Sequence, residues 1–515
     1  MLEVIASVAA RCLPSFKPQD VGNTAWAFAK LVFFHDPFFS ALAISASVNF
    51  HKFPPQNLAN TAWAFAMLLI ANVPVMHAIA GAAMPKLAAF NSQHLAHMFW
   101  SFASLAVIAR PFFEALAEHA IKTVFDFNCQ ELANTVWACA KLAFVNEQLL
   151  GAIAQAARVS IPHFLPQDFA NISWALSKIS YIDVPIMSAM ASVSLQRVHE
   201  FNAQDLSNTV WAFANLQFRN VPLMHSIARH AGTRMGQFEG SDFSSTAWSF
   251  STMELTYEPL FEAIAEEVSK KVASLGPQQL GTLADLNLPC QGAVEEELRV
   301  IIQQFAEDVP SSMDGFRSGR YQTLVEDLAV DSFGSWGDRL LLDLLGIQEC
   351  MLDFRQKATK LAEEYQEQQQ SWWRSESLLR PQVVSVAEID IRAGDFQVNS
   401  MSFQKNGFDG WRPSKEWLRP TVLPFNSLVD RSLCSENQLL SKLYEKLHNA
   451  ALSKTSCRPF GRVQLYVTGA PCLSCVGAMR QFSMLLPLVQ LNVSIGPEIR
   501  PDLSQLLELQ AREKR

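Results

Sequence analysis

Seven tryptophans lie 37 residues apart in the first half of this 515-residue chain. They are Trp26, Trp63, Trp100, Trp137, Trp174, Trp211 and Trp248. The sequence around them recurs, for example as Asn-Thr-Ala-Trp-Ala-Phe-Ala starting at Asn23 and at Asn60. A period of roughly 20–50 residues indicates stacked units, each of which buries its apolar face only against its neighbours. The spacing therefore predicts an α-solenoid over residues 1–290.

Each unit is predicted to contain two helices. The first runs from Pro18 to about Leu31, because proline suits the first helical turn and Asp20 favours a helix N-terminus. A break at residues 35–37 follows, and the second helix covers about residues 38–49. The unit is therefore an all-α helical hairpin.

The register of the repeat also locates its ends. Asp285 takes the place of the tryptophan in a degenerate last copy, so about eight repeats are expected. Met1 falls inside a unit, at the position of a second helix. We therefore expect the sequence to be a piece of a longer protein.

The tryptophans are expected to pack in the core between units, and two rows of neighbouring positions are candidates for binding nucleic acid. An asparagine three residues before the tryptophan either bonds the backbone between repeats or faces a ligand. This row holds Asn23, Asn60, Asn134, Asn171 and Asn208. The position four residues after the tryptophan varies, as a modular reader of bases requires, although a solvated face gives the same pattern. This row holds Lys30, Met67, Ser104, Lys141, Lys178, Asn215 and Thr252.

A third row, near the start of each first helix, also varies in its polar side chains. It holds Asp20, Asn57, His94, Glu131, Asp168, Asp205 and Asp242. The same two interpretations, a row of base readers or a solvated face, apply to it.

The recurring Leu-Ala-Asn-Thr-x-Trp-Ala-Phe-Ala core resembles the heptatricopeptide and octotricopeptide repeats of organellar RNA-binding proteins. The resemblance implies a solenoid that binds single-stranded RNA, roughly one base per unit, as other helical repeat readers do. It also implies a mitochondrial or plastid location. The chain's formal net charge is −8, and residues 1–285 hold 16 Lys and Arg against 20 Asp and Glu. Bulk charge therefore does not hold this array on nucleic acid, and protein partners stay open.

Composition places the chain among folded multidomain proteins. Hydrophobic residues make up 49% and charged residues 17%, and the length exceeds what one core supports. Nine cysteines spread over the chain favour a reducing compartment. No run of about 18 apolar residues is free of polar breaks, so no membrane partner is expected.

The repeat stops before residue 291. Amphipathic patterns at residues 295–302 and 340–345, and a charged stretch at residues 351–370, predict a helical connector over residues 291–380. The connector shows no recognisable chemistry.

From residue 381 the pattern becomes mixed. Residues 384–391, 396–403, 463–467 and 489–495 are predicted strands, and helices are expected after Cys434 and after Pro471. The order β-β-α-β-α-β predicts an α/β domain over residues 381–515.

Three cysteines and a glutamate of this domain have the pattern of a catalytic zinc site. Cys472 and Cys475, three residues apart in a helical first turn, can share one metal, and Cys434 can supply a third thiolate. A catalytic Zn²⁺ takes three protein ligands and leaves its fourth position for water. Glu436 is placed to move a proton from that water to a leaving amine.

Cys-x-Glu followed by Pro-Cys-x-x-Cys resembles the signature of zinc nucleobase deaminases, and the element order resembles the cytidine-deaminase-like fold. The resemblance implies that Cys434, Cys472 and Cys475 bind Zn²⁺ and that Glu436 shuttles protons. Cysteine as the first ligand departs from the histidine of many polynucleotide deaminases and is frequent in free-nucleoside enzymes. Only residues 502–514, a predicted helix, follow the fourth strand, so the usual fifth strand is expected to be missing.

Together the two halves predict an RNA-binding repeat protein with a tethered zinc-dependent deaminase that edits C to U in RNA by hydrolysis. One alternative is a non-catalytic RNA- or protein-binding scaffold with a degenerate deaminase domain. A second alternative is a free-nucleoside deaminase with an interaction array. Cytosine and adenine both stay open as the base.

Overall fold

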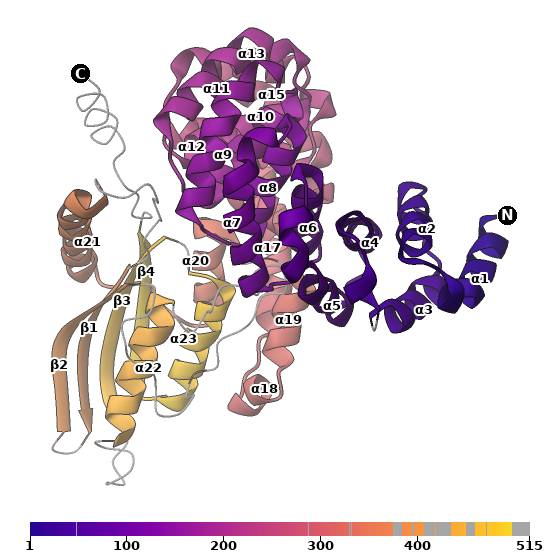
Figure 1. Ribbon diagram of the computed structural model, residues 1–515. Helices are drawn as coiled ribbons and strands as arrows, with labels where there is room; N and C mark the ends of the chain where they lie inside the picture. Colours follow the sequence, from indigo (N-terminus) through magenta and orange to yellow (C-terminus); the bar gives the residue numbers. More distant parts are fainter. Residues whose placement is uncertain are drawn as a thin grey trace. The chain divides into compact units, whose positions relative to one another are not determined.

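The computed structural model describes residues 1–373 except 48, 287, 329 and 331, and then residues 384–393, 396–405, 418, 434–449, 459–469 and 471–496. Helices make up the chain as far as residue 373, and a small four-stranded mixed sheet with two helices follows (Figure 1). This confirms the predicted fold class. The chain divides into two compact units, residues 1–230 and 231–515. The domain boundaries near residues 290 and 380 stay a prediction.

The repeat units are helical hairpins, as predicted. Their first helices are α2 (Pro18–Lys30), α4 (Pro55–Met67), α6 (Ser92–Ser104), α8 (Cys129–Lys141), α10 (Pro166–Lys178), α12 (Ala203–Asn215), α14 (Gly240–Thr252) and the shorter α16 (Pro277–Ala284). Their second helices are α1 (Leu2–Cys12), α3 (Asp36–Ser47), α5 (Val73–Ala83), α7 (Arg110–Thr123), α9 (Glu147–Ser160), α11 (Val184–Arg197), α13 (Val221–Gly232) and α15 (Glu258–Lys271).

A short 3₁₀ turn follows each second helix. These turns are η1 (Leu13–Ser15), η2 (Phe50–Lys52), η3 (Met84–Ala89), η4 (Val124–Asp126), η5 (Ile161–His163), η6 (Val198–Glu200), η7 (Met235–Gln237) and η8 (Val272–Ser274). The residue after the turn is extended and leads the chain into the next first helix.

Each full-length first helix ends in a left-handed residue that is not glycine. In the first unit, Val32 has a φ of 50°. Its N–H donates to the Ala29 carbonyl at 3.0 Å, and the Phe33 N–H donates to the Phe28 carbonyl at 2.9 Å. These two bonds form a Schellman motif, which satisfies the last carbonyls of the helix. The same conformation recurs at Leu69, Ala106, Ala143, Ser180, Gln217 and Glu254.

Phenylalanines, not tryptophans, fill the core of the array. A buried phenylalanine follows the 3₁₀ turn at the same 37-residue period, as Phe53, Phe90, Phe127, Phe164, Phe201 and Phe238. A second buried set lies two residues after the tryptophan, as Phe28, Phe65, Phe102, Phe213 and Phe250. No tryptophan of the repeats is buried, and Trp26 is 40% exposed. The expected tryptophan core is therefore wrong.

Helical geometry explains this difference. In α2 the buried stripe runs through Ala25, Phe28 and Ala29, at the spacing of one helix face. Trp26 lies beside that stripe. Within residues 1–230 the first helices pack on one another more extensively than the second helices do. The alanines of the first helices permit this close approach.

The connector residues are helical, as expected. They form α17 (Gln291–Asp308), α18 (Met313–Arg317), α19 (Arg320–Leu328), α20 (Gly334–Leu344) and α21 (Leu352–Trp373). Helix α18 contacts the second helix of the sheet region, α23 (Leu473–Leu485), and α21 contacts the sheet itself. These helices therefore belong to the same compact unit as the sheet.

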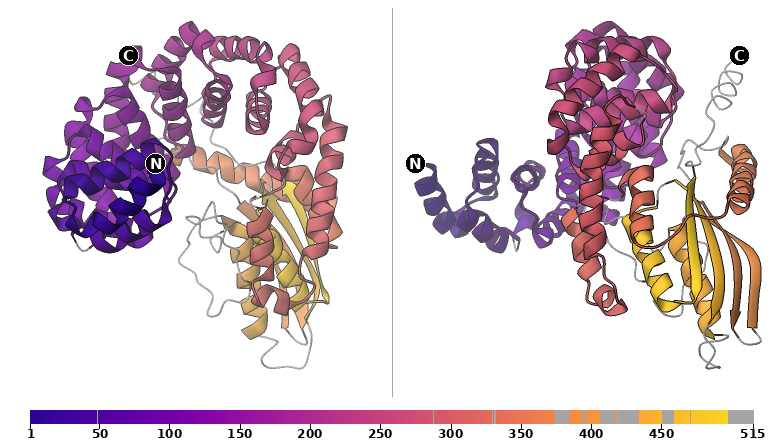
Figure 2. Two further views of the ribbon diagram at one scale, coloured as in Figure 1. Left: turned by 90° about the vertical axis from the view of Figure 1, so that its right-hand side faces the viewer. Right: turned by 180° about the vertical axis from the view of Figure 1, so that it is seen from behind.

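The sheet contains β1 (Val384–Ala393), β2 (Phe396–Lys405), β3 (Phe460–Thr468) and β4 (Val489–Gly496), in the order β2-β1-β3-β4. Strand β1 is antiparallel to β2 and β3, with Ile389 opposite Ser400 and Val463, whereas β4 is parallel to β3. Helices α22 (Ser435–Leu447) and α23 cover one face and α21 covers the other (Figures 1 and 2).

The connector also occupies the outer edge of β4. Gln348 forms a parallel bridge with Asn492, and its carbonyl accepts the Val493 N–H at 2.8 Å. The Cys350 N–H donates to Ser494 Oγ at 3.1 Å. A segment that precedes the sheet in sequence thus lies where a fifth strand would pair with β4, and it protects that edge. The helix predicted at residues 502–514 lies outside the described residues.

Candidate functional site

The three predicted zinc ligands lie together at the N-terminal ends of two helices. Cys434 is the N-cap of α22, Cys472 is the N-cap of α23, and Cys475 lies in the first turn of α23. Cys472 Sγ lies 4.0 Å from Cys434 Sγ and 3.5 Å from Cys475 Sγ, and all three sulfurs lie within 4.8 Å of one another. Tetrahedral bonds of about 2.3 Å place thiolate ligands of zinc about 3.8 Å apart. The cluster can therefore hold a metal ion, and its donor set fits Zn²⁺.

The surroundings of the cluster favour the thiolate forms of the cysteines, which are the forms that bind a metal ion. Both helix N-termini direct partial positive charge towards the sulfurs, which stabilises their deprotonated forms. Without a metal, hydrogen bonds with Cys434 and Cys472, together with burial, hold the pKa of Cys475 well above its usual range. Metal binding would replace these protons.

Glu436 lies in the first turn of α22, two residues after Cys434, and is only 3% exposed. Ser435 Oγ donates to Glu436 Oε2 at 3.0 Å and also contacts Ser385 Oγ at 2.8 Å. Burial, and then the neighbouring Cys472, raises the pKa of Glu436 to about 7. A carboxyl group with a pKa near neutrality can both accept and donate a proton, as general acid–base catalysis requires.

Two further buried residues beside the cluster were not predicted from the sequence. The hydroxyl of Tyr321, from α19, donates to the Leu473 carbonyl between the two cysteines of α23 at 2.6 Å. The Tyr321 ring lies against Gly477 and leaves no room for a Cβ there. Asn437 Nδ2 is buried and has no hydrogen-bond partner within the described part of the chain. The glycine in a helix was the one sequence signal of the Tyr321 contact.

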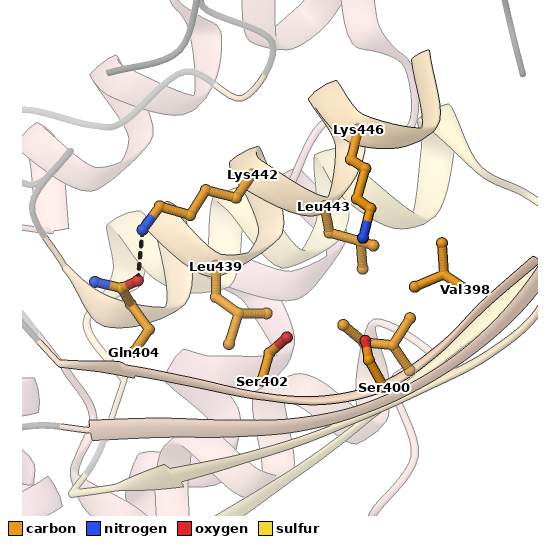
Figure 3. Close-up of a pocket in the computed structure, with 9 residues that line it drawn as sticks. Val398, Ser400, Ser402, Gln404, Leu439, Lys442, Leu443 and Lys446 are labelled. Carbon is orange, nitrogen blue, oxygen red and sulfur yellow. Dashed lines mark hydrogen bonds between the residues drawn. The ribbon is translucent and has the colours of Figure 1, made fainter. Parts of the chain in front are cut away.

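A groove of about 220 Å³ lies between β2 and α22 (Figure 3). Ser400, Ser402 and Gln404 face Lys442 and Lys446 across it, and Lys442 Nζ donates to Gln404 Oε1 at 2.8 Å. None of the cysteines of the cluster lines this groove. It is smaller than the roughly 300–1,000 Å³ typical of small-molecule sites. Because its lining includes neither the three cysteines nor Glu436, the groove is distinct from the candidate catalytic site.

In the array, the asparagine row and the row four residues after the tryptophan share one face of the first helices. In α2 this face carries Asn23, Trp26 and Lys30, all exposed. In the later units these positions are half-buried or exposed. The side chains of the five repeated asparagines make no hydrogen bond to protein groups in the described residues, so they do not bond the backbone between repeats.

Side chains on this face reach from one unit to the next. Lys30 Nζ lies 5.9 Å from the ring centroid of Trp26 and 5.5 Å from that of Trp63. The Trp63 and Trp100 rings lie 6.4 Å apart. Asn215 Nδ2 donates to the Ser177 carbonyl at 3.1 Å and to Ser177 Oγ at 2.9 Å, which ties this predicted reader to the preceding unit.

The third row of polar positions caps the first helices. Six of its members accept a hydrogen bond from the backbone N–H three residues earlier: Asp20, His94, Glu131, Asp168, Asp205 and Asp242. This is half of a capping box, a local device that satisfies a free N–H at the helix start. The idea that these six side chains read bases is therefore wrong.

No helix among the described residues has the length and apolar content needed to span a bilayer.

Comparison with known families gives one finding. Residues 1–184 match the model of a family described as RNA-editing substrate-binding complex 6 protein. The match covers the first five tryptophans and does not reach the cysteine cluster. No curated protein matches the chain. The N-terminal repeats are thus similar to a family named for RNA editing.

Proposed function

We propose that the chain binds single-stranded RNA along its repeat array and deaminates a cytidine of that RNA at the cysteine cluster. One observation carries the proposal: Cys434, Cys472 and Cys475 converge with the buried carboxyl group of Glu436. Three ligands and an adjacent general acid–base group are what hydrolytic deamination of a nucleobase requires.

A Zn²⁺ ion held by the three thiolates would lower the pKa of a water molecule and so supply a nucleophile near neutral pH. Glu436 would accept a proton from the attacking water molecule and deliver a proton to the amino group on C4 of cytosine. The C4–N bond breaks, a C4–O bond has formed, and cytidine plus water becomes uridine plus ammonia. Adenosine would give inosine by the same balance.

RNA as the partner of the array is supported by the partly exposed rows of the first helices and by the family match. The asparagine row and the variable row, Lys30 to Thr252, are the proposed contacts. The matching family is named for an RNA-editing substrate-binding complex. We therefore also propose protein partners from such a complex. The slight excess of acidic residues in the array favours them, because acidic surface repels phosphates.

The full chain, purified with zinc, tests this proposal on two substrates. A cytidine-containing single-stranded RNA and free cytidine are incubated separately with the protein, and uracil formation is measured by mass spectrometry. Conversion in RNA supports editing. Conversion of free cytidine alone supports the nucleoside deaminase with an interaction array. No conversion, with no zinc bound, supports the non-catalytic scaffold.

A further inference from the structure

The repeated tryptophans lie on a surface, although they are the largest apolar side chains of each unit. Trp26 is 40% exposed, and Trp63, Trp100, Trp137, Trp174 and Trp211 are half-buried in residues 1–230. Their indoles all project from the same position of consecutive first helices. A row of partly exposed aromatic rings is uncommon on a surface unless it binds something.

Core packing does not explain why all seven units have a tryptophan at the same position of the first helix. The phenylalanines at two other positions of each unit fill the core, and alanines mediate the close approach of the first helices. A leucine or methionine would serve equally well at a half-buried position that only covered the core. The indole is nevertheless present in seven successive units.

The groups beside each indole are those that accompany a base. In five of the seven units an asparagine lies three residues earlier and is partly exposed, and its amide makes no hydrogen bond to protein groups in the described residues; the other two units have His97 and Ser245 there. An amide has two donors and an acceptor for a base edge. In α2, the Lys30 ammonium lies over the rings of Trp26 and Trp63, where a phosphate can also reach it.

We propose that the tryptophans of the first helices form a base-stacking surface for single-stranded RNA, with each preceding asparagine bonding a base edge. The inference rests on the proposed RNA binding and names its contact. An indole stacks on any base, so the fixed position supplies affinity without sequence preference. The variable position four residues later then supplies discrimination between bases.

Charge supports stacking as the main source of affinity. Residues 1–285 hold 16 basic against 20 acidic residues, and the cations of the two proposed rows are Lys30, Lys141 and Lys178, so this face can neutralise few phosphates. Binding that releases few counterions depends weakly on salt. The stacking surface therefore predicts that RNA affinity falls less than about tenfold between 50 and 200 mM salt, whereas a protein with 6–10 phosphate contacts loses roughly 10³–10⁵.

The test uses the full chain and a fluorescently labelled 20-residue oligouridine. Three variants are compared with the unchanged protein by fluorescence anisotropy: W137L/W174L, W137F/W174F and the control F125L. Phe125 is 64% exposed and lies in the 3₁₀ turn after a second helix, away from the first-helix face. Circular dichroism confirms that each variant is folded.

The leucine pair should bind RNA at least about 30-fold more weakly, since each lost stack costs roughly tenfold. The phenylalanine pair, which keeps two aromatic faces, should stay within about fivefold, and F125L should be unchanged. Equal binding by the leucine pair and the unchanged protein would overturn the stacking surface while leaving RNA binding intact. If the unchanged protein does not bind RNA, the proposed function itself fails.

A second measurement does not depend on variants. Ultraviolet crosslinking of the unchanged protein to the same RNA should attach uridine to peptides that contain the first-helix tryptophans. Crosslinks confined to second-helix peptides would overturn the proposal.

Discussion

The repeat array and the cysteine cluster distribute their chemistry in opposite ways. In the array, a tryptophan recurs every 37 residues, so the loss of one leaves six like it. In the cluster, each of four side chains is present once, and two helices bring them together from positions about 40 residues apart in the sequence. Damage to the array should therefore be local and graded, whereas damage to the cluster should be complete.

Removing a metal ligand should have the largest effect. Cys475→Ala leaves two sulfurs, too few for a stable catalytic site, so bound zinc should fall from about one per chain to background. Elemental analysis of the purified chain measures this. The matched control is Cys350→Ala, another buried cysteine of the same unit, whose Sγ lies 3.3 Å from the Leu465 carbonyl. Equal zinc in both variants would exclude the cluster as the metal site.

Removing one core phenylalanine should cause a large but local loss. Phe201→Ala should lower the free energy of unfolding by about 3–5 kcal/mol, because a fully buried ring leaves a cavity. Units contact mainly their neighbours, so hydrogen exchange should accelerate in adjacent repeats and leave α22 and α23 unchanged. If hydrogen exchange accelerated as much in the sheet region as in the repeats next to Phe201, the division of the chain into an array and a separate site would be contradicted.

The hydroxyl of Tyr321 should contribute less. Tyr321→Phe keeps the ring against Gly477 and removes the bond to the Leu473 carbonyl, which is then buried without that partner. The expected cost is about 1–3 kcal/mol, with weaker zinc binding, since this carbonyl lies between two ligands. Competition with a chelator measures zinc affinity. An unchanged affinity would show that the connector supports the sheet but not the metal site.

The smallest expected effect is a gain. Val32 is β-branched, and its backbone is in the left-handed region, which strains a residue with a Cβ but not glycine. Val32→Gly should therefore stabilise the first unit by about 1 kcal/mol. Thermal unfolding measures it, with Ala29→Gly, inside the same helix, as a destabilising control. Destabilisation by Val32→Gly would mean that packing of the valine outweighs its backbone strain.

The sequence predicted well those features that repeat or that have short fixed spacing. The tryptophan period located every helical hairpin, and Cys-x-Glu with Cys-x-x-Cys picked out the sulfurs that converge. A period does not say which side of a helix faces the neighbour, so it does not distinguish a core of tryptophans from the core of phenylalanines that the structure has. The phenylalanine set at Phe53 and its equivalents has the same period and was a usable signal.

Other features of the structure leave no recognisable pattern in the nearby sequence. The left-handed helix ends carry valine, leucine, alanine, serine, glutamine or glutamate instead of the usual glycine, so no residue type marks them in the sequence. The contacts of Tyr321 with Leu473 and of Gln348 with Val493 join residues about 150 positions apart. Such pairings depend on the packed structure, and the segment that looked like a connector therefore proved to support the candidate site.

Glu436 gives the most direct test of the central claim, that the cluster deaminates a base of RNA bound to the array. The zinc-loaded chain and its Glu436→Gln variant are compared at equal RNA occupancy, and C-to-U conversion is followed by sequencing the RNA. The variant should bind zinc and RNA normally and convert roughly 10²–10⁴-fold more slowly, the usual contribution of a general acid–base group. Equal rates of conversion by the two proteins would contradict the account.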